Sequence, residues 1–183
     1  MRPKRWLYRV KQFFKTVIAR PAPTDLELVQ RTLTSEQTAL FTQLQPSEQA
    51  HAVRVLQAVE KHCKCEGVEV PDALKVAALL HDIGKARYPL RIWERVTIVL
   101  GKALWPEASA RWGTGVPRGW RRPFVIAAQH PAWGAALASE HGVSPRAVAL
   151  IRRHQDKLSP LAQGDFTDDD HLLVILQAVD DES

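Results

Sequence analysis

The amino-acid sequence predicts an all-α fold. Along most of its 183 residues, apolar side chains recur three and four positions apart, which is the spacing of one face of a helix. Prolines and capping residues mark several helix starts, and no stretch alternates as a half-buried strand would. The composition, 45% hydrophobic and 25% charged, is typical of a globular domain, and no apolar run is long enough to span a membrane.

The first 20 residues form a basic arm. They carry seven Lys and Arg residues and no acid, and this +7 exceeds the formal charge of the whole chain, +5. Apolar side chains, among them Trp6, Val10, Phe13, Phe14 and Val17, fall on one stripe of a predicted helix. Such an amphipathic helix can lie on an anionic membrane surface, or it can pack on the domain or on a partner protein. Both alternatives stay open at this point.

Residues 21–183 are predicted to form one domain of successive helices. Proline favours the first turn of a helix, and Ser or Thr followed by Glu or Gln three residues later forms a capping box. The predicted helix starts, in chain order, are Thr34 with Gln37, Pro46 for a helix ending near Gly67, Pro71 for a helix ending at His81-Asp82, Leu90 for a helix ending at Leu104, Pro131, Ser144-Pro145 and Thr167.

Residues 86–129 are predicted to be a basic, Trp-rich insert. They hold four tryptophans, and eight Lys and Arg residues against two acids. Because Lys85 and His130 bracket the insert, we expect it to lie near the functional site. One interpretation is that Arg122 or a neighbouring arginine binds a phosphate while a tryptophan stacks on a base. The other is that the tryptophans pack the insert on the bundle and the arginines face water.

The two cysteines do not predict a disulfide or a zinc site. Cys63 and Cys65 lie two residues apart in a predicted helix, so their side chains point to different faces. The sequence therefore favours a reducing, cytoplasmic setting, with residues 1–20 as the candidate for peripheral membrane or protein contact.

Three polar residues occupy helix positions where apolar ones are expected. His51 lies four residues before Val55, Asp180 lies four after Leu176, and His154 shares the apolar face of the helix from Pro145. A single inward histidine is more often a hydrogen-bonded core residue than a ligand, but an unpaired buried carboxylate is costly. Several imidazoles and carboxylates that face one interior are typical of metal coordination.

The run His81-Asp82-Ile83-Gly84-Lys85 is the centre of the predicted site. It ends an apolar helix, and its glycine suits a helix C-terminus. Adjacent side chains diverge around a helix, but at a helix end both His81 and Asp82 can reach one site. The two oxygens of a carboxylate can bridge two cations, which a histidine cannot do.

This run resembles the motif of the HD phosphohydrolase superfamily, an all-helical group named for its His-Asp doublet. Residues 49–55 resemble the superfamily's first-histidine helix, and residues 176–183 resemble its final-aspartate helix. The resemblance spans roughly residues 47–183 and implies an HD-domain helical bundle. The metal ligands that it implies are His51, His81, Asp82 and Asp180.

His130 and His154 fall between the doublet and the final aspartate, an order similar to that of the two-metal variant of the superfamily. This likeness implies that the two histidines hold a second divalent ion and that Asp82 bridges both ions, with iron or manganese favoured. It implies hydrolysis of a phosphoester in a phosphorylated small molecule or nucleotide, cyclic dinucleotides included, by a hydroxide that bridges the metals. Lys85 is the candidate to hold a phosphate oxygen as a point charge. The alternative is that it is only a lysine near a helix C-terminus, where the helix dipole favours a positive charge.

The HD-GYP branch of the superfamily has paired histidines and a Gly-Tyr-Pro further on. In this chain Gln155 follows His154 and Gly-Tyr-Pro is absent, so the sequence is more similar to the HD domains of seven-transmembrane cyclic-di-AMP phosphodiesterases.

Two other interpretations of the same residues stay open. One alternative is a one-metal HD nucleotidase in which His130 and His154 are structural or bind substrate. The other is a non-enzymatic module that binds a nucleotide or a partner through its basic insert.

Overall fold

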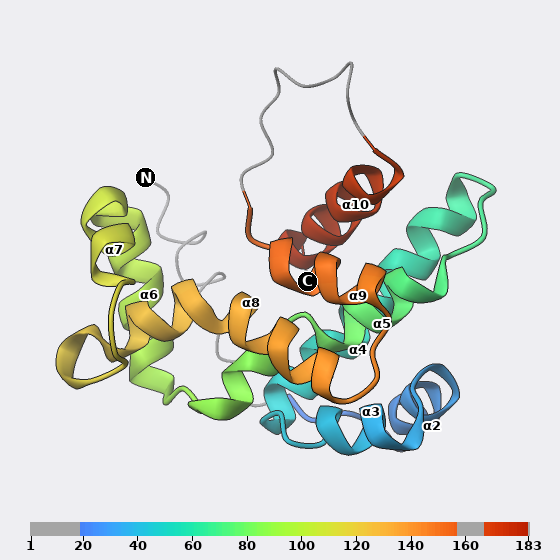
Figure 1. Cartoon of the computed structure of the whole chain (residues 1–183), viewed down its shortest axis with the longest axis horizontal. Coiled ribbons are helices and arrows are strands. Elements are labelled where there is room, and N and C mark those ends of the chain that lie inside the picture. The colour runs from blue at the N-terminus through green and yellow to red at the C-terminus, as the bar shows by residue number, and fades with distance from the viewer. Residues whose placement is uncertain (1–18, 157–166, 183) are drawn as a thin grey trace, which may run out of the picture.

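The computed structural model describes residues 19–156 and 167–182. Over these residues the fold is all-α, as predicted, and contains no β-strand (Figure 1). The predicted helix of the basic arm lies in residues 1–18, outside the described residues. Within the described ranges, no helix combines the length and the apolar character that crossing a bilayer requires.

From α2 to α9 the described helices follow one another with short connections, and two of the elements are short 3-10 helices. Their bounds are α2 Pro23–Thr32, α3 Ser35–Phe41, α4 Pro46–Cys65, α5 Asp72–Leu80, η1 Ile83–Arg87, α6 Ile92–Leu104, α7 Pro106–Trp112, η2 Gly119–Arg121, α8 Arg122–Glu140, α9 Pro145–Arg153 and α10 Asp168–Glu182.

Most helices begin where the sequence predicted. At the start of α3, the Thr34 hydroxyl accepts a hydrogen bond from the Gln37 backbone N–H at 3.3 Å, and the Gln37 side-chain oxygen accepts one from the Thr34 N–H at 3.2 Å. At the start of α9, the Ser144 hydroxyl accepts from the Ala147 N–H at 3.4 Å. These contacts satisfy backbone donors that a helix start otherwise leaves without partners.

One predicted helix start is wrong. The sequence predicted a helix that follows Pro131, but α8 begins at Arg122 and continues through Pro131, which is buried inside the helix. Pro123 stands near the first turn and serves as the true proline start. Pro131 removes one internal hydrogen bond, yet the apolar residues on both sides of it pack on neighbouring helices and hold the helix together.

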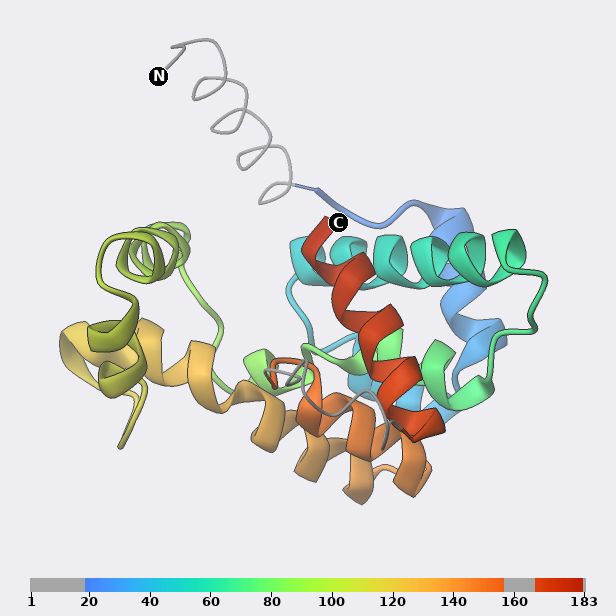
Figure 2. The same ribbon diagram turned by 90° about the horizontal axis from the view of Figure 1, so that it is seen from above.

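The helices form a bundle with a lobe beside it (Figures 1 and 2). In the bundle, α4, α5, α9 and α10 pack on one another, and α2 packs against α4 and α5. The lobe consists of α6 and α7, which pack on each other and on the N-terminal half of α8, whereas the rest of α8 packs on η1 and α9. Figure 2 shows α8 running from the lobe to the bundle.

A single apolar core fills the bundle and fixes the helices that carry the polar residues of interest. Fully buried side chains from α4, α5, α9 and α10 meet there, including Leu56, Leu79, Leu150 and Leu176. The predicted inward faces of these helices are therefore confirmed. Burying each such side chain contributes about 1.5–3 kcal/mol, so the positions of the four helices are strongly determined.

Candidate metal centre

The six predicted ligands meet between the bundle helices. His51 comes from α4, His81 ends α5, Asp82 stands between α5 and η1, and Asp180 comes from α10. His130 lies in the middle of α8 and His154 caps the C-terminal end of α9. The structure thus brings together side chains that lie as far as 129 positions apart in the sequence.

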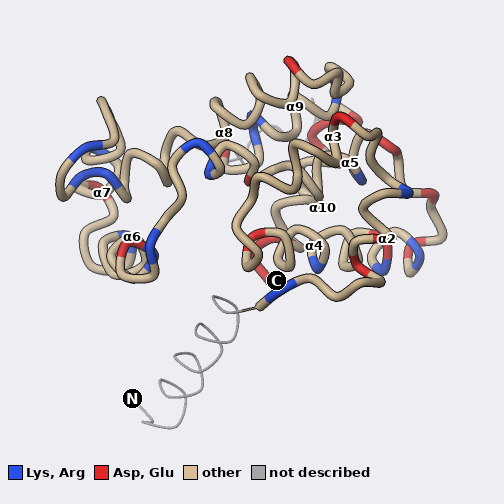
Figure 3. Tube along the Cα trace, turned by 90° about the horizontal axis from the view of Figure 1, so that it is seen from below, with Lys and Arg blue, Asp and Glu red and all other residues tan. Residues whose placement is uncertain are grey.

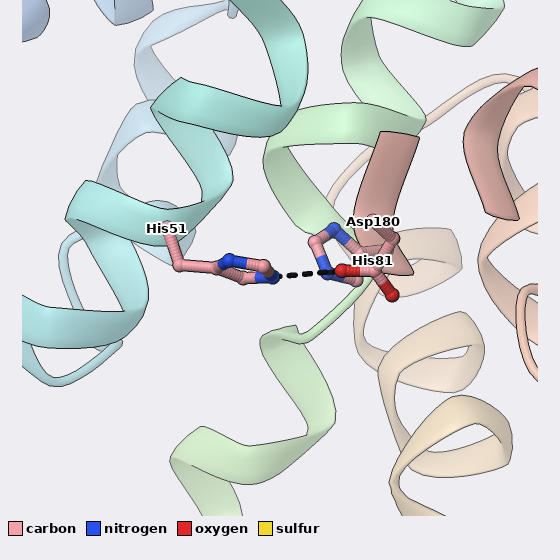
Figure 4. Close-up of side chains that lie close together, drawn as sticks. All are labelled: His51, His81 and Asp180. Carbon is pink, nitrogen blue, oxygen red and sulfur yellow. Dashed lines mark hydrogen bonds and ion pairs between the residues drawn. The ribbon is translucent and has the colours of Figure 1, made fainter. Parts of the chain in front are cut away.

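A first group of possible ligand atoms belongs to His51, His81 and Asp180, all within 4.8 Å of one another. Figure 4 shows the three side chains pointing toward a common point. The Nε2 atom of His51 lies 2.8 Å from Asp180 Oδ1, and Nε2 of His81 lies 3.5 Å from the same oxygen. His51 and Asp180 are half-buried, whereas His81 is fully buried.

A second group belongs to Asp82, His130 and His154, again within 4.8 Å, and all three are buried. The Nε2 atoms of the two histidines lie 3.2 Å apart. Each ring also faces a backbone carbonyl through Nδ1, so this pair of Nε2 atoms has no donor hydrogen to share when both rings are neutral. Two lone pairs that face each other fit a cation between them.

Asp82 connects the two groups. Its Oδ1 atom lies 3.1 Å from His130 Nε2 and 3.9 Å from His154 Nε2. Its Oδ2 atom lies 3.6 Å from His81 Nε2 and accepts a hydrogen bond from Lys85 Nζ at 2.6 Å. Each oxygen of this carboxylate therefore faces a different group, which is the arrangement that a ligand shared by two ions requires.

The three buried histidines are oriented by backbone carbonyls. A carbonyl oxygen can only accept a hydrogen bond, so in each neutral ring Nδ1 carries the proton and Nε2 is left as the possible ligand atom. At His81 this Nε2 makes no hydrogen bond with any described residue. The carbonyl acceptors are Ala78 for His81 at 2.9 Å, Ile126 for His130 at 3.1 Å and Ile151 for His154 at 2.7 Å.

The electrostatics of the cluster favour bound positive charge. Burial lowers the pKa of His154 to about 3, and the charges of His81 and His130 add to this effect. Burial opposes the charged form of His81 too, but the adjacent carboxylates outweigh it and raise the pKa of His81 to about 9. The pKa of Asp82 lies well below its ordinary value, because Lys85 and His81 overcome the desolvation of the carboxylate. The cluster therefore holds a proton on His81 where no metal cation is bound.

Gly84 brings the doublet against α8. A side chain at this position would overlap the backbone carbonyl of His130 and approach the Gly134 N–H. The sequence predicted that this glycine ends a helix, but its φ is not positive, and its role is this close approach. The absence of a side chain at Gly84 thus lets Asp82 and His130 come within 3.1 Å.

Of the two predicted phosphate-binding residues, one lies at the cluster and the other lies in the lobe. Lys85 contacts Asp82 directly. Arg122 pairs with the buried carboxylate of Glu94 and donates to the Pro89 carbonyl at 3.1 Å, rather than contacting any of the six clustered residues. Its role in binding substrate stays a prediction.

A cleft of about 300 Å³ opens beside the cluster. Its bundle wall includes His154 and Asp180, and its other wall includes Lys102 of α6. From the sequence, Lys102 is only one of the eight cations of the insert, because no sequence pattern indicates that α6 lies opposite α9 and α10. The lining residues are Lys102, His154, Gln155, Asp156, Gln177, Asp180 and Asp181.

Comparison with models of known families gives a match that spans the residues of this site. A family model described as "HD domain" matches residues 49–181, a range that includes all six clustered residues. No curated protein and no solved structure matches the chain significantly.

Proposed function

The chain belongs to the HD domain family, and on this premise we propose that it hydrolyses a phosphoester of a nucleotide-type substrate with two divalent metal ions. The family accounts for the general activity, that of a metal-dependent hydrolase with a phosphorylated substrate. The number of ions rests on one observation, which is that Asp82 directs one oxygen toward each of two ligand groups.

We assign His51, His81 and Asp180 to one ion, His130 and His154 to the other, and Asp82 to both. Imidazole and carboxylate ligands without thiolates suit iron or manganese. Bound divalent ions act as Lewis acids, which lower the pKa of a water molecule and neutralise charge on phosphate oxygens.

The surrounding residues orient the ligands and the substrate. Backbone carbonyls fix the three buried rings, and Lys85 fixes Oδ2 of Asp82. An ammonium group has three donors, so Lys85 can keep its contact with Asp82 and also donate to a non-bridging phosphate oxygen. On the opposite wall of the cleft, Lys102 offers a second cation to a substrate that carries more than one phosphate.

The test compares the wild-type chain with His130→Ala, both purified without oxygen, for metal content per chain and for hydrolysis of bis(4-nitrophenyl) phosphate. We expect two ions in the wild type, one in the variant, and a loss of activity of at least about a hundred-fold. His62→Ala is the matched control, because His62 is exposed near the C-terminal end of α4.

One ion in both proteins, with equal activity, would contradict the two-metal assignment and favour the one-metal nucleotidase. Two ions without hydrolysis of any tested ester would favour the binding module. If both expectations are met, a comparison of mononucleotides with cyclic dinucleotides identifies the substrate class.

A further inference from the structure

The exposed apolar residues of the described chain concentrate in the lobe. Nine of the twelve large hydrophobic side chains that are exposed among the described residues lie between positions 92 and 120. Six of them belong to α6, with exposed fractions of 37% to 60%. These six residues, named the α6 apolar face below, are Ile92, Trp93, Val96, Val99, Leu100 and Leu104.

The α6 apolar face is a continuous strip and not a scatter of single residues. On a helix with about 3.6 residues per turn, the six positions fall within an arc of about 140°. The opposite side of α6 packs against the rest of the protein. Glu94 and Gly101 are buried there, and Gly101 packs close to Phe124 of α8. The strip therefore faces away from the helices that support α6, and burial within the lobe does not explain it.

The charges around this strip are almost all positive. Exposed cations in the lobe and its connections are Arg91, Lys102, Arg111, Arg118 and Arg121. Glu107 is exposed, whereas Glu94 is buried and paired with Arg122. Figure 3 shows Lys and Arg positions distributed along α6, α7 and the segment that leads to α8, with few acidic positions among them.

These charges distinguish between the possible occupants of the strip. The basic arm, residues 1–20, carries +7, so like charges oppose its packing on the cationic lobe. A second copy of the chain would bring one cationic border against another and meets the same repulsion. An anionic lipid surface complements both features, since its headgroups attract the cations while its acyl boundary accepts aliphatic and Trp side chains.

We propose that the α6 apolar face docks the protein on the surface of an anionic lipid bilayer. The axis of α6 then lies in the plane of the interface, with Trp93 and the aliphatic residues at the acyl boundary and the lobe's cations at the headgroups. The seven cations of residues 1–20 add to the attraction without needing any particular structure. Lys102 flanks the strip and also lines the cleft, so the metal centre would open close to the bilayer.

The test is flotation of the full chain with vesicles of phosphatidylcholine alone or mixed equally with phosphatidylserine. Val96→Ser with Val99→Ser removes two valines from the strip. Val68→Ser with Val174→Ser is the matched control, because these two valines are similarly exposed but lie outside the lobe. Circular dichroism and hydrolysis of a soluble ester report whether the fold and the metal centre are intact.

The wild type and the control should float with the anionic vesicles and not with the neutral ones. The strip variant should bind about ten-fold more weakly, the loss expected for two partly inserted valines, while its ester hydrolysis stays unchanged. Absence of wild-type flotation would overturn the proposal. Equal flotation of the strip variant would overturn it as well, since binding would then reside elsewhere, as in residues 1–20. A wild-type dimer that the strip variant converts to a monomer would identify the strip as a self-interface.

Discussion

His81 differs from the other two buried histidines in the charges that face its ring. Asp82 and Asp180 lie 3.6 Å and 3.5 Å from its Nε2 atom, whereas His154 faces two other imidazoles and the more distant Asp82. Three residues of one type in one cluster thus have pKa values displaced in opposite directions. The ring with the raised pKa is the one that binds a proton most tightly, so it is where proton and metal ion compete.

The metal-free protein should become less stable as the pH rises from about 6.5 to about 9. His81 has a pKa of about 9 in the folded chain and an ordinary value near 6.5 in the unfolded chain. Its contribution is therefore complete below pH 6.5 and is lost as the pH rises through 9. The loss is on the order of 2–3 kcal/mol, measured by urea unfolding with a chelator present.

His81→Gln should show little of this alkaline loss. The metal-loaded wild type should show less of it too, since the bound cation replaces the proton. An alkaline dependence that is unchanged in His81→Gln would assign the titration to another group.

The sequence predicted which side chains gather in the cluster, because metal coordination restricts residue type. A buried histidine or aspartate on an apolar helix face is conspicuous, and the His81–Lys85 run fixed the order of the rest. The roles of Gly84 and Lys102 were not predictable in the same way. Each depends on which helix lies opposite, α8 for the glycine and α9 with α10 for the lysine.

At the scale of elements, one ion pair joins the lobe to the bundle. Arg95 of α6 donates to the carboxylate of Glu48 in the first turn of α4 at 2.7 Å, and to the Gln45 side chain at 3.0 Å. Glu48 is almost fully buried and its pKa is raised by that burial, although Arg95 and Lys85 oppose the shift. Because α4 also carries His51, this pair links the position of α6 to a helix of the metal centre.

Arg95→Met should destabilise the protein by about 3 kcal/mol at pH 7. The substitution leaves a buried carboxylate without its cation, and that desolvation cost exceeds the value of the pair itself. The loss should shrink at lower pH, as Glu48 becomes neutral. Urea unfolding at pH 7 and pH 5 measures both effects.

Adding Glu48→Gln to Arg95→Met should recover part of the lost stability, since the unpaired charge is then absent. If the double variant is as unstable as the sum of the single ones, the two side chains act independently and the link between the helices lies elsewhere.

Helix starts and the long helices were predictable, whereas the course of α8 was not. Capping contacts and proline starts act within one turn, so Thr34 and Ser144 identified α3 and α9 from local sequence. Pro131 carries a local preference for a helix start that tertiary packing overrides. A local rule therefore failed where long-range burial decided the outcome.

At the scale of the whole molecule, the candidate metal centre draws side chains from five helices that otherwise meet through the apolar core. The helices are α4, α5, α8, α9 and α10, which together make most of the bundle. Ligands for a bound ion assemble only in the folded chain, so metal binding adds to the stability of the entire bundle.

Chelation should therefore lower the melting temperature of the purified protein by about 5–15 °C. This range follows from metal at a hundred to a thousand times its dissociation constant and from a domain of this size. Differential scanning calorimetry before and after dialysis against a chelator measures the shift, and added Mn²⁺ should restore it. A chelated protein that has lost its metal but melts at the same temperature would contradict the assignment of the six ligands.

The helix α8 connects the lobe directly to the candidate metal centre. This one helix supports the lobe with its N-terminal half and presents His130 to the metal centre from its middle, beside the missing hydrogen bond at Pro131. Lys102 stands on the lobe and Asp180 on the bundle, so any change in the tilt of α8 relative to the bundle would alter the width of the cleft and the position of the His130 ring together.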